Sequence, residues 1–184
     1  MRFPAESRGI DPATHHAVRR RGTPDPAAPG SSPSSADRTV IVLDTNVLSE
    51  SLRPTPSAVV LRWLAAQAPS AVFTTTVTLA EVLYGIEALP PGKRRTRLLA
   101  AVEKMFAEEF AGRILPFDED AARAYAGIVA SRDRAGRPIS QFDATIAAIA
   151  RSRSAAVATR NTADFDRCGI RIIDPWAGSA ASGP

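Results

Sequence analysis

The stretch Thr39-Val-Ile-Val-Leu-Asp-Thr-Asn-Val-Leu-Ser-Glu50 decides the fold. Its first residues, up to Leu43, are β-branched or apolar without alternation, which is typical of a strand buried on both faces in a parallel sheet. Asp44 follows this run directly, at the point where such a strand ends. The stretch therefore predicts an α/β domain with its first carboxylate at the carboxyl edge of the sheet.

Strand-like and helix-like segments alternate along the rest of the chain. Short apolar runs predict further strands at residues 71–75, 113–117, 155–159 and 171–174. Apolar residues at helical spacing predict helices at residues 47–51, 57–67, 76–89, 93–110, 119–134 and 141–151. This alternation favours a three-layer α/β/α domain with a mainly parallel central sheet.

Polar residues stand where several of these helices begin. We expect Asp118 and Ser140 to cap the helices that follow them, and either Thr76 or Thr78 to cap the helix that ends near Leu89. A capping side chain accepts a hydrogen bond from a backbone N–H group that has no partner within the helix. These residues therefore mark the predicted helix starts.

The chain is expected to consist of a tail, one domain and a short end. Residues 1–38 are rich in Pro, Gly, Ser and Arg and lack apolar periodicity, so we expect them to be disordered. This long lead also suggests an overcalled start, with the true chain beginning near Val40 or Val42. Residues 39–176 form the predicted domain, and residues 177–184 are expected to be a flexible C-terminus.

Composition narrows the class of protein. The chain has 184 residues, of which 45% are hydrophobic and 23% charged, as in ordinary globular proteins. No apolar run approaches the ~18 residues of a membrane helix, and the N-terminus lacks the apolar core of a signal peptide. Cys168 is the one cysteine, which excludes an intrachain disulfide and a cysteine-built zinc site. We therefore expect a cytoplasmic protein with no membrane partner.

Carboxylates stand at positions that parallel strands would bring together. Asp44 follows the first predicted strand, and Glu81 lies one turn into the helix after the second. Asp143 opens the helix that leads into the fourth strand, and Asp164 follows that strand. Taken singly, each is explained as a helix cap or a solvated acid, and Glu81 and Asp143 even have a Thr or Ser three residues earlier to pair with. The combination is what points to a site.

Ligands bind beyond the carboxyl ends of strands in an open parallel sheet, so these carboxylates are expected to converge. Unpaired they would repel one another, and a divalent cation removes the repulsion. Oxygen ligands favour Mg²⁺ or Mn²⁺ over zinc. We expect Asp44 and Asp143 to be direct ligands, and Glu81 and Asp164 to complete the site through water or a second ion. Hydroxyl and amide side chains beside these acids are expected to orient them: Thr45, Asn46, Thr159 and Asn161.

The expected chemistry is phosphodiester hydrolysis. A metal ion lowers the pKa of a bound water and offsets the charge that builds on phosphate oxygens. The chain has no Walker-type Gly-x-x-x-x-Gly-Lys loop for a nucleotide. Its two histidines, His15 and His16, lie in the tail, which leaves no credible Ser–His nucleophile pair.

Basic residues bear on the substrate. The formal net charge is +4, which is compatible with a nucleic-acid partner. Two clusters stand out, at residues 93–97 and 132–137. We interpret the first as a solvated helix surface. The second lies close to the proposed site and is the better candidate for contact with phosphate.

Five blocks of sequence follow one another along the predicted domain, at residues 42–50, 78–85, 136–148, 158–165 and 172–176. Their order and spacing resemble those of PIN-domain ribonuclease toxins of the VapC/FitB type. The last block departs from the family pattern, which more often reads Asn-Pro-Trp where this chain has Asp174. In the resemblance, the family's acidic positions fall on Asp44, Glu81, Asp143 and Asp164.

The resemblance implies an Mg²⁺-dependent endoribonuclease, a hydrolase that inhibits growth by cleaving RNA as the toxin of a type II toxin–antitoxin pair. It also implies a cognate antitoxin protein that blocks the site, and a homodimer. Two alternatives stay open. In one, the protein is a non-catalytic partner of a DNA-binding antitoxin in transcriptional autoregulation. In the other, it is a DNA- or RNA-processing nuclease without any antitoxin.

Overall fold

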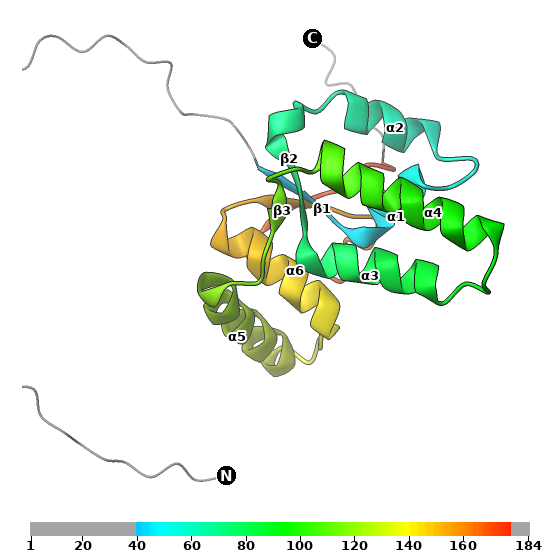
Figure 1. The fold of residues 1–184 in the computed structure, drawn as a ribbon. Coiled ribbons are helices and arrows are strands. Elements are labelled where there is room, and N and C mark those ends of the chain that lie inside the picture. The colour runs from blue at the N-terminus through cyan, green and yellow to red at the C-terminus, as the bar shows by residue number, and fades with distance from the viewer. Residues whose placement is uncertain (1–39, 178–184) are drawn as a thin grey trace, which may run out of the picture. The chain divides into compact units, whose positions relative to one another are not determined.

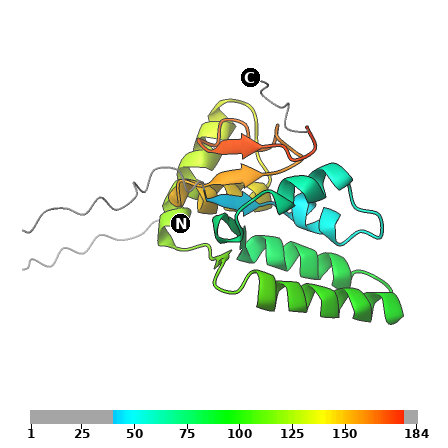
Figure 2. The ribbon, with the colours of Figure 1, turned by 90° about the horizontal axis from the view of Figure 1, so that it is seen from above.

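A five-stranded parallel sheet forms the centre of the domain, in the order β3-β2-β1-β4-β5. The computed structural model describes residues 40–177, so the predicted tail and most of the C-terminal end lie outside the described residues. Figure 2 shows β5, β4 and β1 side by side. The strands are β1 Ile41–Leu43, β2 Val72–Thr75, β3 Ile114–Leu115, β4 Ala156–Ala158 and β5 Arg171–Ile173.

Helices cover both faces of this sheet (Figure 1). In chain order they are α1 Thr45–Ser51, α2 Ala58–Ala65, α3 Thr76–Glu87, α4 Lys93–Lys104, α5 Glu119–Arg134 and α6 Gln141–Ser152, with a short 3-10 turn at Pro69–Ala71. The three-layer architecture and the parallel sheet predicted from the sequence are confirmed. Within residues 40–177 no helix combines the length and the apolar character needed to cross a membrane.

Strand β1 shows why the core has two halves. Ile41 and Leu43 belong to a cluster that α1 to α4 cover, whereas Val42, between them, belongs to a second cluster under α5 and α6. Successive side chains of a strand point to opposite faces, so a continuous apolar run serves both clusters at once. The run that decided the fold in the sequence therefore sits in the middle layer, buried from both sides.

The predicted helix starts are confirmed at two of three places. Asp118 and Ser140 accept hydrogen bonds from backbone N–H groups of α5 and α6. The prediction for α3 is wrong, because Thr75 is its cap: its hydroxyl accepts from the N–H of Thr78 at 3.0 Å. Thr75 is the last residue of β2 and keeps an extended backbone, as a cap requires, while Thr76 is already helical.

The long helix predicted for residues 93–110 is divided. α4 ends at Lys104, and the chain continues through the π-helical turn Met105–Glu109. The rings of Phe106 and Phe110 lie 5.7 Å apart, and both are buried. Wider π turns are uncommon and leave no strong sequence signal, since they keep a near-helical side-chain pattern.

Candidate functional site

Asp44 is the most deeply buried acid of the candidate site, with 4% of its surface exposed. It follows β1 and caps α1, so Oδ1 accepts a hydrogen bond from the Thr45 N–H at 2.7 Å. Oδ2 accepts from the Asn46 amide at 2.7 Å and from the Thr159 hydroxyl at 2.8 Å. A buried carboxylate is tolerated when hydrogen bonds compensate for lost water, and Asp44 has three.

Hydrogen bonds tie the end of β1 to the end of β4. The hydroxyl of Thr159 accepts from the Asn161 N–H and from the Asn46 amide, each at 3.0 Å. The amide oxygen of Asn46 accepts from the Arg160 N–H at 3.1 Å. These bonds fix the side chains of Asn46 and Thr159, which in turn hold the carboxylate of Asp44 in one orientation.

Glu81 reaches the same place from α3. It is half-buried, and the Thr45 hydroxyl donates a hydrogen bond to its Oε2. Thr45 thus bridges two acids, because its N–H donates to Asp44 and its hydroxyl to Glu81. The capping interpretation of Glu81 with Thr78 is not what the structure shows, since the hydroxyl of Thr78 lies against Thr75 instead.

Asp143 lies in the first turn of α6 and is half-buried. The Ser140 hydroxyl accepts from the Asp143 N–H at 3.1 Å and donates to Oδ2 at 2.6 Å. The capping pair suggested by the sequence is therefore present. It does not compete with a site role, because Oδ1 accepts no hydrogen bond from the described residues.

The environment of Asp44 raises the pKa of its carboxyl from 3.8 to about 6. Burial is the main cause, and the negative charges of Asp143 and Glu81 add to it. Hydrogen bonds from the Thr159 hydroxyl and the Thr45 N–H act in the opposite direction. The structure thus brings Asp44, Glu81 and Asp143 within electrostatic reach of one another.

Asp164 is placed differently. It is exposed, and its backbone N–H donates to the carbonyl of Asn161 at 3.1 Å. Its charge is not among those that raise the pKa of Asp44. The structure therefore leaves Asp164 outside the group that Asp44, Glu81 and Asp143 form.

The donor set suits a hard divalent cation. Among residues 40–177 no three Asp, Glu, His or Cys side chains form a ready-made metal cluster. Mg²⁺ does not require one, because it keeps several waters and binds through one or two carboxylates. Oδ1 of Asp44 accepts only one hydrogen bond from the described residues, which leaves it a lone pair. The raised pKa of Asp44 shows that its ionised form is disfavoured there, and a nearby cation would stabilise that form.

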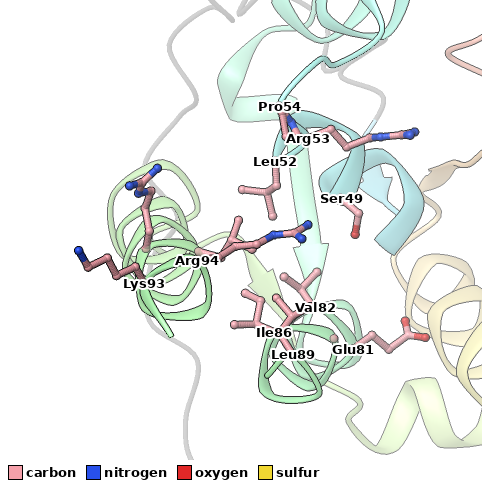
Figure 3. A pocket seen from close by; sticks show the side chains of 13 residues that line it. Ser49, Leu52, Arg53, Pro54, Glu81, Val82, Ile86, Leu89, Lys93 and Arg94 are labelled. Carbon is pink, nitrogen blue, oxygen red and sulfur yellow. The ribbon is translucent and has the colours of Figure 1, made fainter. Parts of the chain in front are cut away.

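A cavity of about 940 Å³ borders Glu81, between α1, α3 and α4. Figure 3 shows the apolar side chains Leu52, Val82 and Ile86 facing one another in it. The cations along its wall are Arg53, Lys93, Arg94 and Arg97. The first basic cluster is therefore more than the solvated helix surface expected from the sequence. The sequence shows these basic residues, but whether their side chains point to the solvent or to the cavity depends on how α4 packs against α3.

Two members of the second basic cluster interact with Asp166 in the loop after β4. Arg132 is 5% exposed, and its guanidinium donates to the carbonyl of Asp166 at 2.6 Å. Arg137 lies 3.2 Å from the carboxylate of the same residue. The expectation that this cluster is the better candidate for phosphate contact is wrong for Arg132, because a buried side chain that holds a loop is not available to a substrate.

Glu50 is a buried acid that sequence reasoning did not single out. Its Oε1 accepts from the Ser57 N–H at 2.8 Å, and its Oε2 lies 3.0 Å from Arg53. The Ser57 hydrogen bond and the Arg53 guanidinium hold the pKa of Glu50 below its usual range. Glu50 therefore fastens the connection between α1 and α2, beside the cavity.

Comparisons with known proteins point to one family. The family model described as "PIN domain" matches residues 41–170. The "VapC ribonuclease Y4jK" of Sinorhizobium fredii is 42% identical over 74% of this chain and 98% of its own length. The structure of FitAB bound to an IR36 DNA fragment contains a chain 40% identical, with a TM-score of 0.71 over 74% of this chain and 96% of that chain.

A second similar structure is VapBC-5 of Mycobacterium tuberculosis, a member of the VapBC family of toxin–antitoxin systems. It is 32% identical with a TM-score of 0.55, over 73% of this chain and 98% of that chain. The family model spans the whole sheet except its last strand, and it includes Asp44, Glu81, Asp143 and Asp164. The chain therefore belongs to the PIN-domain family.

Proposed function

We propose that this protein is a metal-dependent endoribonuclease that acts in the cytoplasm as the toxin of a type II toxin–antitoxin pair. The observation that carries the proposal is the buried, hydrogen-bonded Asp44 with Glu81 and Asp143 beside it, at the carboxyl edge of a PIN-domain sheet. Similarity to a protein named a VapC ribonuclease supports RNA as the substrate. Similarity to a toxin–antitoxin system supports the biological role.

The four acids would have different roles in holding the metal ion. Asp44 and Asp143 would hold Mg²⁺ or Mn²⁺ directly, and Glu81 and Asp164 would complete the site through water or a second ion. An ion bound there would lower the pKa of a bound water and offset the negative charge of the scissile phosphate. The hydroxyl of Thr45 orients Glu81 by the hydrogen bond already described.

Asp44 must be ionised to do this, and its burial opposes ionisation. A divalent cation next to it favours the charged form, because opposite charge lowers the pKa of a carboxyl. The donors Asn46 and Thr159 are hydrogen-bonded to each other, and Asn46 also accepts from the Arg160 N–H just after β4. The site is thus preorganised for the ion rather than built by it.

The cavity beside Glu81 supports an antitoxin partner. It combines an apolar floor with four cations, which suits a peptide that carries both apolar and acidic side chains. A peptide seated there would cover one side of the carboxylate site and block RNA. The proposal also includes a homodimer, as the family resemblance implies.

Expression of the toxin without an antitoxin tests the proposal. We expect growth arrest and new RNA 5′ ends with the unaltered chain, and neither with Asp44→Asn or Asp143→Ala. Asp133→Ala, which changes an exposed acid on α5, is the matched control and should arrest growth normally. If Asp44→Asn still arrests growth and the RNA ends match, the carboxylates do not catalyse. The non-catalytic partner of a DNA-binding antitoxin then becomes the better explanation.

A further inference from the structure

Two exposed aromatic residues lie close in sequence to the carboxylates of the site. Tyr84 on α3 is 76% exposed and Phe142 on α6 is 57% exposed, the largest exposures of the large hydrophobic side chains in residues 40–177. Tyr84 follows Glu81 by three positions, and Phe142 directly precedes Asp143. Neither ring packs against another aromatic ring of the described chain. Exposed rings of this size need an explanation.

Tyr84 lies on a side of α3 whose first residues contact α6. Val77, Glu81 and Tyr84 lie on one side of α3, at spacings of four and three residues. Val77 packs against the core cluster that contains Ile146 of α6, where the two helices are in contact. Along this side of α3, Val77 is the residue packed toward α6, Glu81 follows it, and Tyr84 lies one turn beyond Glu81.

Phe142 lies in the first turn of α6, the helix that carries Asp143. It shares a stripe with Ile146 and Ile149, both fully buried, but lies at the exposed N-terminal end of the helix. Asp143, next in the chain, contributes to the raised pKa of Asp44, so this end of α6 faces the site. Figure 1 shows that end beside α3. The two rings thus lie on the two helices that supply Glu81 and Asp143, within three residues of those acids along the chain.

We propose that Tyr84 and Phe142 are stacking platforms for unpaired bases of the RNA on either side of the scissile phosphate. The inference rests on the proposed ribonuclease function and adds two residues that would position its RNA. Proteins bind unpaired RNA by stacking its bases on aromatic side chains. Every base has a stacking face, so two rings position a strand without fixing its sequence.

Charge explains why stacking is needed here. A site built from Asp44, Glu81 and Asp143 repels the phosphates of a polyanion until a metal ion is bound. Binding energy from aromatic stacking does not depend on the sign of that charge. The same acids argue against the rings as the core of a protein interface, because such cores are depleted in charged residues. The geometry therefore favours RNA over a second protein surface.

Binding of an end-labelled, single-stranded RNA of about 12 nucleotides and randomised sequence tests this, by fluorescence anisotropy with Mg²⁺ present. The parent protein carries Asp44→Asn so that it does not cut the probe. We expect Tyr84→Ala and Phe142→Ala each to weaken binding about 5- to 100-fold. Tyr84→Phe and Phe142→Tyr keep the rings and should bind within about twofold of the parent. The slope of affinity against salt should not change, because no phosphate contact is removed.

Leu61→Ala is the matched control for loss of an exposed apolar side chain. Leu61 is 40% exposed on α2, which packs on the sheet face opposite α6. Sedimentation of the same samples separates the remaining outcomes. Alanine variants that bind RNA like the parent but lose the homodimer would show that the rings are a protein interface and overturn the inference. If the unaltered chain makes no new RNA 5′ ends when it is expressed, the proposed function fails. If it does make them and the alanine variants bind RNA as well as the parent, only the stacking inference fails.

Discussion

Asp44 and Asp164 both follow parallel strands of one sheet, yet the protein treats them differently. Asp44 comes directly after β1, is 4% exposed and accepts three hydrogen bonds. Asp164 comes six residues after the end of β4 and is exposed, without a hydrogen bond to its carboxylate from the described residues. Burial raises the pKa of Asp44 to about 6. Position after a strand is thus not sufficient to make a site; the turn that follows decides whether the acid is enclosed.

The difference has a physical consequence. An enclosed carboxylate interacts with a cation through little intervening water, so its charge acts at nearly full strength. An exposed carboxylate is screened by water and salt. We therefore expect Asp44 to bind the ion directly and Asp164 to act at the edge of the site, which makes the pair a quantitative test.

The largest expected effect is on RNA cleavage. Asp44→Asn should lower kcat/KM by about 10³-fold, because it removes a direct ligand of an ion that supplies several kcal/mol of transition-state stabilisation. Asp164→Asn should lower it only about 10- to 100-fold, as loss of an outer group does. Initial rates on a cleavable RNA at saturating Mg²⁺ measure both. Equal losses in the two variants would mean that exposure does not separate their roles.

The second effect concerns metal removal. A ligand that binds only the folded state stabilises it, by about 2.7 kcal/mol at a concentration 100 times its Kd. We expect Mg²⁺ or Mn²⁺ to raise the Tm of the unaltered protein by several degrees, and EDTA to reverse the shift. Asp44→Asn should abolish the shift, whereas Asp164→Asn should retain most of it. Thermal unfolding followed by circular dichroism gives both numbers, and a full shift with Asp44→Asn would rule out Asp44 as a ligand.

The third effect is on stability without metal. Because the pKa of Asp44 is raised in the folded state, that state binds more protons between about pH 4 and pH 6, and stability falls as the pH rises through this range. Two pKa units correspond to about 3 kcal/mol. Asn removes this penalty but replaces one accepting oxygen with an NH2 group, which leaves at least one of the three donors without its acceptor. We therefore expect Asp44→Asn to gain on the order of 1 kcal/mol at pH 7.5 in EDTA.

Urea unfolding of both proteins at pH 4.5 and pH 7.5 checks this prediction. The advantage of Asp44→Asn should shrink or reverse at the lower pH, where the native carboxyl is already protonated. Asp164→Asn, on the exposed side of the comparison, should change the free energy of unfolding by less than about 0.5 kcal/mol at either pH. A gain for Asp44→Asn that is independent of pH would contradict the assigned cause.

The smallest effect is on the pH profile. Thr159→Val removes a hydrogen bond that lowers the pKa of Asp44, so that pKa should rise further. The rising limb of kcat/KM against pH should therefore move to higher pH, by about one unit or less. Thr162→Val, at an exposed threonine between Thr159 and Asp164, is the control and should leave the profile in place. A shift to lower pH with Thr159→Val would show that the hydroxyl does not act on Asp44.

Much of the fold could be predicted from residue patterns. Continuous apolar runs such as residues 40–43 identify buried parallel strands, and Asp118 and Ser140 mark helix starts by their chemistry. The cap of α3 was missed because three threonines in a row, Thr74 to Thr76, offer the same side chain. Only the residue that remains extended at the end of the strand can act as the cap, and sequence does not show where the helix begins.

The candidate site could be predicted only in outline. Chain order and the rule for parallel sheets place Asp44, Glu81 and Asp143 at one edge, and the structure brings these three into electrostatic reach. The sequence did not show that Asp164 is exposed while Asp44 is buried, and it favoured the basic cluster at residues 132–137 over the one at residues 93–97. It could not show that Arg132 is buried or that α4 turns Arg94 and Arg97 toward a cavity.

The sequence by itself determined the layers of this protein, the positions of its strands and which residues carry carboxylates. These follow from local properties, namely side-chain branching, apolar spacing and hydrogen-bonding groups beside the backbone. Tertiary structure alone decided how much water each acid retains and which cations face it. Desolvation and charge depend on groups far apart in the chain, such as Asp44 and Thr159, so they exist only once the sheet has formed.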